Sequence, residues 1–381
     1  AEYGPVSTEY NNGITTIQLG IVTGYEARIE WVYYTTLQEA VNATKRYPNN
    51  EKDTVTLIKD LQLKETLEVS ETKDMILDLD RYTLTVATGN NTVINNYGDL
   101  EITDSSIEQT GEITIISTST CYGIYNYGNG TVEITRGTVS SSSSGTFNYS
   151  YGIYNASAGS IEITGGTVSS SSNGSFSQSY GIYNASTGRI EITLGTVSSS
   201  SSGSSGIGQN DGYGIYNASS GSIEVTGGTV SSSGGSGRSY GIYNARSGTV
   251  EVTKGTVSGE DYGIYNNDNG TIEVTGGTVS SNSYGIYNNG SGTVKIVEGT
   301  VSSSSITDSF GIFNRDIGTV EVTGGTVSSS SSSSGDSYGI YNSGSGTVEV
   351  TGGTVSSSSS GSSVSYGIYN VKTGTITKGI K

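Results

Sequence analysis

One five-residue sequence, Tyr-Gly-Ile-Tyr-Asn, recurs along most of this chain. It occurs nine times, and a Phe-Gly-Ile-Phe-Asn variant fills the one gap in the series. A second phrase, Gly-Thr-Val-Glu-Val-Thr-Gly-Gly-Thr-Val-Ser with small changes, lies between the copies. A whole circuit of structure therefore repeats, and the chain is predicted to be a stack of circuits. The copies lie at 122–126, 151–155, 180–184, 213–217, 240–244, 262–266, 284–288, 310–314, 338–342 and 366–370.

The shortest repeats, which begin at Tyr240 and Tyr262, are 22 residues long. Each holds three β-prone runs: Tyr-Gly-Ile-Tyr-Asn, Thr-Val-Glu-Val-Thr and Thr-Val-Ser. Gly, Asn and Ser separate these runs, as turns require, and no helical periodicity lies between them. We therefore expect an all-β fold, a single-domain parallel β-helix (β-solenoid) with three strands per rung. Successive rungs would lie roughly 4.8 Å apart.

Strand alternation gives each side chain of the motif a direction. In one copy, Tyr262, Ile264 and Asn266 share a face, and Gly263 and Tyr265 share the other. Exposure of every Ile would be costly, so we expect the Ile face, with the first aromatic residue, to point inward. The second aromatic residue then forms an outward ladder of stacked rings, and the Asn forms a ladder of amides. These ladders comprise Tyr125, Tyr154, Tyr183, Tyr216, Tyr243, Tyr265, Tyr287, Phe313, Tyr341 and Tyr369, and Asn126, Asn155, Asn184, Asn217, Asn244, Asn266, Asn288, Asn314, Asn342 and Asn370.

The second run of each circuit carries an outward acidic residue between two inward apolar ones. Like charges on adjacent strands repel, so we expect raised carboxyl pKa values along this row. One interpretation is a solvated face that keeps the stack soluble. The alternative is a row of weak Ca²⁺ sites, because Ca²⁺ prefers oxygen ligands. The row comprises Glu133, Glu162, Glu191, Glu224, Glu251, Glu273, Glu321 and Glu349, with Lys295 interrupting it.

Composition limits the classes of function. The net charge of −17 disfavours nucleic acid and anionic membrane surfaces as partners. There is no His, the commonest general base, and the single Cys121 is expected to pack at a rung corner. No apolar run is long enough for membrane insertion. Ala1 resembles the first residue left by signal-peptide removal, although an engineered start would look the same, so we expect a secreted, extracellular or cell-surface protein.

Three regions follow from these patterns. We expect residues 1–34 to form a strand-like extension and possible donor segment, and residues 35–90 to form a capping helix with irregular first rungs. Residues 91–381 are expected to form the regular array. Thr36-Leu37-Gln38-Glu39 has capping-box spacing, which predicts a helix over 37–47 that covers the first rung. Irregular strands are expected at 54–58, 61–63, 66–69, 75–79 and 82–86. The Ser/Gly tracts at 140–145, 198–206, 328–335 and 356–361 are expected to be flexible bulges that leave one corner.

The opening residues carry a family resemblance. The run 36–41 (Thr-Leu-Gln-Glu-Ala-Val), the run 56–60 (Thr-Leu-Ile-Lys-Asp) and the run 77–85 (Leu-Asp-Leu-Asp-Arg-Tyr-Thr-Leu-Thr) resemble the start of pectin-lyase-like right-handed parallel β-helices of microbial surface and secreted, adhesin-like repeat proteins. The resemblance implies the fold and a right-handed coil, but not an activity, because that fold hosts lyases, hydrolases, tailspikes and adhesins. The lyases of the family use clustered acidic Ca²⁺ ligands and a basic residue on one face. The basic residues Arg136, Arg189, Arg238, Arg246 and Arg315 fall in different slots of different rungs, so we do not expect an enzyme or a resident cofactor.

The two ends of the array suggest self-association. The segment at 12–23 is strand-like and lies outside the body, and the last circuit stops inside a rung with no capping pattern. We expect the extension to pair with a neighbouring copy, against its last rung, through Ile14, Ile17, Leu19, Ile21, Ile376 and Ile380. The alternatives are that the segment folds back on its own body, or that the natural chain continues past Lys381.

These features predict a structural subunit of an extracellular filament or surface fibre that assembles head to tail with itself. The alternative is a monomeric adhesin or glycan-binding stalk, since aromatic faces suit sugar rings. An ice-binding surface would use the outward Thr and Ser of Thr-Val-Ser, but bulging Ser tracts would interrupt the flat array that it requires.

Overall fold

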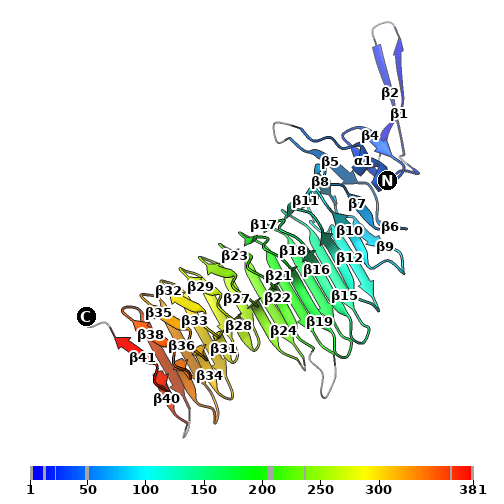
Figure 1. Cartoon of the computed structure of the whole chain (residues 1–381). Coiled ribbons are helices and arrows are strands. Elements are labelled where there is room, and N and C mark those ends of the chain that lie inside the picture. The colour runs from blue at the N-terminus through cyan, green and yellow to red at the C-terminus, as the bar shows by residue number, and fades with distance from the viewer. Residues whose placement is uncertain are drawn as a thin grey trace.

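Three long parallel sheets wind around one axis in the computed structural model (Figure 1), which describes residues 3–11, 14–21, 23–47, 51–203, 210–235, 237–360 and 363–378. The first, which we call the tyrosine sheet, comprises β7 (Leu67–Val69), β10 (Thr92–Asn96), β13 (Cys121–Asn126), β16 (Tyr149–Asn155), β19 (Gln178–Asn184), β22 (Gly212–Asn217), β25 (Ser239–Asn244), β28 (Tyr262–Asn267), β31 (Tyr284–Asn289), β34 (Ser309–Asn314), β37 (Ser337–Asn342) and β40 (Ser365–Asn370).

The other two sheets complete each rung. The glutamate sheet comprises β4 (Val32–Tyr34), β3 (Ala27–Ile29), β5 (Asp53–Leu57), β8 (Asp74–Asp78), β11 (Asp99–Thr103), β14 (Val132–Ile134), β17 (Ile161–Ile163), β20 (Ile190–Ile192), β23 (Ser222–Val225), β26 (Thr249–Val252), β29 (Thr271–Val274), β32 (Thr293–Ile296), β35 (Thr319–Val322), β38 (Thr347–Val350) and β41 (Thr375–Lys378). The serine sheet comprises β6 (Leu61–Leu63), β9 (Thr83–Val86), β12 (Glu112–Ser117), β15 (Thr138–Ser143), β18 (Thr167–Ser172), β21 (Thr196–Ser201), β24 (Thr229–Gly234), β27 (Thr256–Gly259), β30 (Thr278–Ser281), β33 (Thr300–Ser305), β36 (Thr326–Ser331) and β39 (Thr354–Ser359).

Each strand of the array pairs in parallel with its equivalent one rung away. Ile153 faces Ile182 in the tyrosine sheet, and Val168 faces Val197 in the serine sheet. Equivalent positions of the repeat therefore meet from rung to rung along the array, and most of them hold identical or similar residues. The predicted parallel β-helix with three strands per rung is confirmed.

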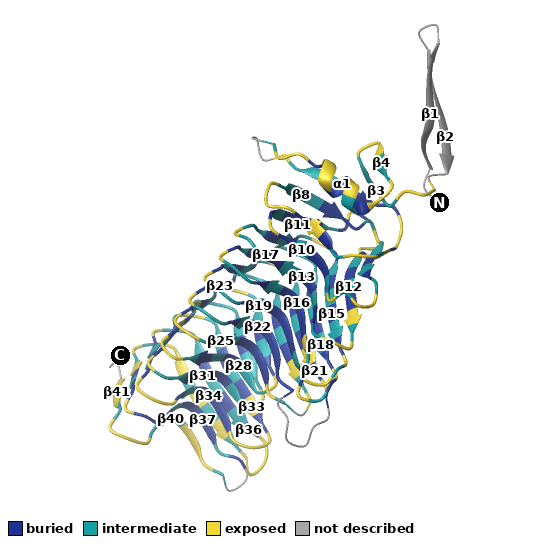
Figure 2. Ribbon diagram, turned by 45° about the vertical axis from the view of Figure 1, so that its right-hand side comes forward, coloured by how far each residue is buried: buried dark blue, intermediate teal, exposed yellow. Residues whose placement is uncertain are grey.

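The core is a continuous column of Ile, Val and Leu inside the coil. Inward residues such as Ile153, Val168 and Ile190 are 0% exposed, and Figure 2 shows buried strand segments between exposed turns. Burial of these side chains removes apolar surface from water, which stabilises the fold by about 25 cal/mol for each Å² buried. Because every rung repeats the same inward set, every inner rung is stabilised in the same way.

The first rung is covered as the capping box predicts. Thr36 caps α1 (Leu37–Ala43), and its side chain accepts from the Glu39 N–H while the Glu39 carboxylate accepts from the Thr36 N–H. The helix ends earlier than residue 47 because Thr44 adopts an extended conformation. From α1, the Gln38 side chain donates to the Glu68 carbonyl and accepts from the Glu68 N–H, both at 2.9 Å. The helix thus satisfies the backbone of β7, the first strand of the tyrosine sheet.

The N-terminal extension forms a hairpin. The strands β1 (Tyr3–Asn11) and β2 (Ile14–Ile21) pair antiparallel with each other, and among the described residues this two-stranded sheet shares no strand with the solenoid. Residues 27–34, assigned to the extension from the sequence, instead form β3 and β4. The strand β3 pairs antiparallel with β5 on one side and with β4 on the other, so β4 is the edge strand at this end of the glutamate sheet. No helix in the described part of the chain is long and apolar enough to cross a membrane.

The first four residues of each Ser/Gly tract continue a strand of the serine sheet, so in this part the tracts are not the expected bulges. In β15 and β18 the residues from Ser140 to Ser143 pair in register with the residues from Ser169 to Ser172. Alternate hydroxyls face inward, where Ser141 and Ser150 share a hydrogen bond of 2.7 Å. The prediction was wrong because it took Ser for a turn residue, whereas the neighbouring rungs supply the ladder partners that keep these residues extended.

Candidate functional site

A fully buried ladder of asparagine amides runs along the interior. Each Nδ2 donates to the Oδ1 of the Asn in the following rung at 2.8–3.0 Å, from Asn96 to Asn370. The same nitrogen donates to the carbonyl of the Gly four residues on, as Asn155 does to Gly159 at 2.6 Å. All Asn of the ladder through Asn342 are 0% exposed. This double use of Nδ2 fixes the turn of each rung and ties it to the next.

Both aromatic residues of the motif stand on the outer face, in two adjacent columns. The outer column, from Tyr125 to Tyr369, has ring centroids 4.7–5.4 Å apart. The other column, from Tyr122 to Tyr366, has spacings of 4.8–5.8 Å. The two columns meet edge to face. Each ring therefore packs against rings above, below and beside it.

The expectation that the first aromatic residue joins the Ile core was wrong. Tyr180 contacts Tyr183 edge to face at 5.2 Å, and the tyrosines form a cluster separate from the Ile and Val core. The alternation fails at the Gly-Ile pair, where both residues face inward. A Cβ on Gly181 would lie 2.8 Å from the Val197 Cγ1 of the core, so only Gly fits there.

The tyrosine columns are poorly hydrated. Burial, with smaller contributions from neighbouring tyrosines, raises the pKa of Tyr125 and of Tyr183 to about 12. Two further rings extend the outer column beyond its first repeat: Tyr127 stacks on Tyr125 at 4.0 Å, and Tyr97 stacks on Tyr127 at 4.8 Å. The repeat motif does not include these two residues, so the sequence pattern missed them.

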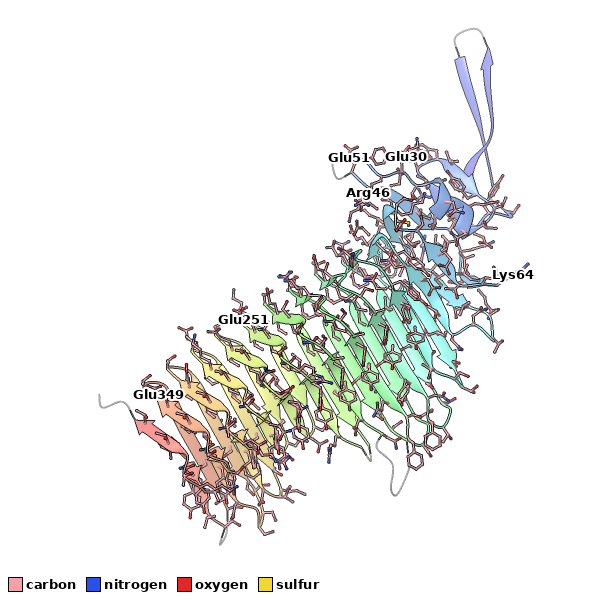
Figure 3. The ribbon with its side chains drawn as sticks, in the orientation of Figure 1. Glu30, Arg46, Glu51, Lys64, Glu251 and Glu349 are labelled. Carbon is pink, nitrogen blue, oxygen red and sulfur yellow. The ribbon has the colours of Figure 1, made fainter. Side chains whose placement is uncertain are left out.

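The acidic row lies on the outer face of the glutamate sheet, where Glu133, Glu162 and Glu191 are direct neighbours. Burial and the charges of Glu133 and Glu191 raise the pKa of Glu162. Figure 3 labels two members, Glu251 and Glu349, on the same long side of the solenoid. In Glu162 the expected repulsion is present.

Basic residues relieve other parts of the row. Arg189 bonds the carboxylates of Glu191 and Glu224, the latter at 2.8 Å, and Lys295 bonds Glu273 at 2.7 Å. Lys52, from outside the array, lies 3.3 Å from Glu101. The sequence does indicate the Arg189–Glu191 contact, because residues two positions apart in a strand have side chains on the same face. The expectation of repulsion between neighbouring carboxylates did not include the Arg189 ion pairs.

Metal binding was a second interpretation of this row. Neighbouring carboxylates stand on adjacent rungs, but in the described ranges no three Asp, Glu or Cys side chains are grouped so that they could hold a metal ion.

Two hollows lie on the outer face of the serine sheet. A shallow trough follows outward hydroxyls over successive rungs, from Ser140 and Ser169 to Ser328 and Ser356. The first four residues of each Ser tract are strand and extend the hydroxyl array, which the tracts had been expected to interrupt. The trough is concave, however, whereas an ice-binding face has to be flat.

The proposed assembly residues lie at the two ends. Ile14 and Ile21 begin and end β2, which also contains Ile17 and Leu19 and pairs with β1. Ile376 lies in β41 and is 42% exposed, while Ile380 lies outside the described residues. Of the described strands, β41 pairs only with β38. Its second backbone edge carries no described partner strand.

Cys121 packs at a corner of the first full rung. Its side chain is buried and lies 3.4 Å from the Ser142 carbonyl and 3.9 Å from the Ser150 hydroxyl. Burial raises the pKa of the Cys121 thiol to about 11, so it is held as an unreactive thiol.

The chain was compared with known proteins. No family model matches it, and neither a curated protein nor a solved structure matches it.

Proposed function

We propose that this protein is a structural subunit of an extracellular filament or surface fibre. The observation that carries the proposal is the in-register repetition of all three sheets, with buried amides and stacked rings meeting from rung to rung. Such a stack is stiff along its axis, because bending would separate ladder partners at many rungs together. Its described surface offers ladders and troughs in place of a cluster of catalytic groups.

Assembly of copies end to end follows from the same geometry. The strands β39, β40 and β41 pair on one side only within the described chain, and Tyr366 and Ile376 there are 40% and 42% exposed. Unpaired strand edges accept further strands. We assign the β1–β2 hairpin of a neighbouring copy as the donor, which gives a head-to-tail contact that continues indefinitely.

The proposal also places the protein outside the cell. The resemblance of the first rungs to pectin-lyase-like β-helices of microbial surfaces supports secretion to the cell exterior. The high negative charge supports a well-solvated fibre that does not clump laterally.

Concentration-dependent sedimentation tests the proposal. The expected result is a mass distribution that grows with protein concentration far beyond the 39.4 kDa chain. A single 39.4 kDa species at every concentration would refute head-to-tail assembly. A matched variant without residues 1–24 should remain monomeric under all conditions.

A glycan-binding stalk is the second candidate. In the tyrosine columns each inner ring has both faces covered by its neighbours, as Tyr183 is by Tyr154 and Tyr216. The columns therefore present ring edges and hydroxyls, whereas sugar stacking requires ring faces. This geometry favours a stabilising role for the columns over sugar binding.

A further inference from the structure

The repeat breaks at one place on the corner between the tyrosine and glutamate sheets. The residue after the ladder Asn is Ala in four consecutive rungs, the last of them Ala245. In the next two rungs it is Asn267 and Asn289, and in the rung after these it is Arg315. The backbone stays equivalent, because the N–H groups of Ala245 and Arg315 both donate to the ladder Asn of the preceding rung at 2.9 Å. At this position only the side chain changes.

The turn that follows also changes in these two rungs. Asp268 has a φ of 73° and Gly290 a φ of 124°, both in the left-handed region. The Asp268 N–H donates to the Asn289 carbonyl at 2.8 Å, and its carbonyl accepts from Ser291 and Gly292. Residues with strained backbone, and positions that break a regular pattern, cluster at functional sites.

The altered turns border a shallow polar recess that is open to solvent. Its lining includes Tyr243, Arg246, Asn267, Asp268, Asn289 and Asp316, which come from four successive rungs. The tyrosine contributes an aromatic edge, since its faces are covered by its own column. Arg246, the two Asn and the two Asp of the lining supply side-chain hydrogen-bond donors and acceptors.

The two amides are held in place by each other. Asn289 Nδ2 donates to Asn267 Oδ1 at 2.7 Å, and Arg315 donates to Asn289 Oδ1 at 3.2 Å. In contrast, Arg246, Asp268 and Asp316 are exposed, and their side chains make no hydrogen bond or ion pair within the described parts of the chain. One guanidinium and two carboxylates at the recess are thus open to solvent and to a ligand.

We propose that this recess binds the ring of a neutral carbohydrate. Carboxylates accept from pairs of hydroxyls and a guanidinium donates to hydroxyl oxygens, so this set suits a ligand that is donor and acceptor at once. An anion would be repelled by Asp268, Asp316 and the net charge of −17. The inference is independent of the filament, because it uses no residue of either end.

Saturation-transfer NMR with the methyl glycosides of glucose, galactose, mannose and N-acetylglucosamine tests the proposal on the full chain. At least one glycoside should bind. Asp268→Asn with Asp316→Asn should weaken that binding at least tenfold, since the shapes remain while the charges go. Asn tolerates the left-handed backbone at 268, so the fold is expected to persist.

Two controls make the result decisive. Glu349→Gln removes one exposed charge on another face and should leave binding unchanged. Asn267→Ala with Asn289→Ala installs the residue that the chain uses in equivalent rungs, so it should fold and bind weakly. Absence of binding by all four glycosides, or equal binding by the Asp268→Asn/Asp316→Asn protein with an unchanged melting temperature, would overturn the proposal.

Discussion

The side-chain amide of Asn155 donates to the side-chain oxygen of Asn184 at 2.8 Å, and both residues are 0% exposed. This bond joins two rungs from inside the coil, where water cannot replace it. Because a buried polar group without a partner costs about 1–3 kcal/mol, each member of the ladder depends on its neighbours.

Replacement of Asn184 by Ala should therefore destabilise the protein strongly. The substitution leaves the Asn155 amide, the Asn217 oxygen and the Gly188 carbonyl without this partner. We expect a loss of about 3 kcal/mol or more in the free energy of unfolding, measured by chemical denaturation. Asn173→Ala, at an exposed position, should change it by less than about 0.5 kcal/mol. Equal effects of both variants would show that the ladder does not contribute.

Gly181→Ala should be more costly than Gly367→Ala. A Cβ at 181 would lie 2.6 Å from the Gly214 carbonyl oxygen and 2.8 Å from Val197 Cγ1, whereas at 367 the nearest atom is the Val355 carbonyl oxygen at 3.3 Å. Overpacking of this kind costs about 1–3 kcal/mol. Thermal unfolding of the two variants measures the difference, and similar melting temperatures would contradict the inward orientation of the motif Gly.

The tyrosine columns should make stability fall in alkali. The pKa values of Tyr125 and Tyr183 are raised to about 12, above the unfolded value of about 10. The folded state then holds more protons, so this contribution is fully present below pH 10 and is lost as the pH rises toward 12. Absorbance at 295 nm should show most tyrosines ionising together with unfolding. Ionisation near pH 10 with the fold intact would contradict the burial of the columns.

Glu162→Gln should stabilise the protein slightly at neutral pH. Burial and two neighbouring carboxylates raise the pKa of Glu162, so its charged form is disfavoured in the folded state. The gain should be a few tenths of a kcal/mol, because the site is partly exposed, and should vanish as the pH falls through the raised pKa. Melting curves across pH measure it. The same curves with EDTA and with added Ca²⁺ test the calcium interpretation, for which a raised melting temperature in Ca²⁺ is required.

The repeat made most of the fold predictable. Equal spacing of identical motifs determines which residues meet, as Ile153 meets Ile182, and the Thr36–Glu39 box marked the capping helix. Directions within the motif were harder to predict. Period-two alternation placed the first Tyr in the core, because it does not foresee that Gly and Ile both turn inward.

The ion pairs between circuits were not predictable. Arg189 and Lys52 meet carboxylates on other rungs, so the charge of each slot alone does not show which glutamates are paired. The recess near Asp268 was also missed, because the repeat drew attention to what recurs and the site lies where the repetition stops.

Head-to-tail assembly is the central claim, and negative-stain electron microscopy of the full chain beside the variant without residues 1–24 tests it most directly. The account predicts uniform unbranched fibres from the full chain and single short rods from the variant, with nearly equal melting temperatures. Dispersed rods of one subunit length from both proteins at every concentration would contradict it.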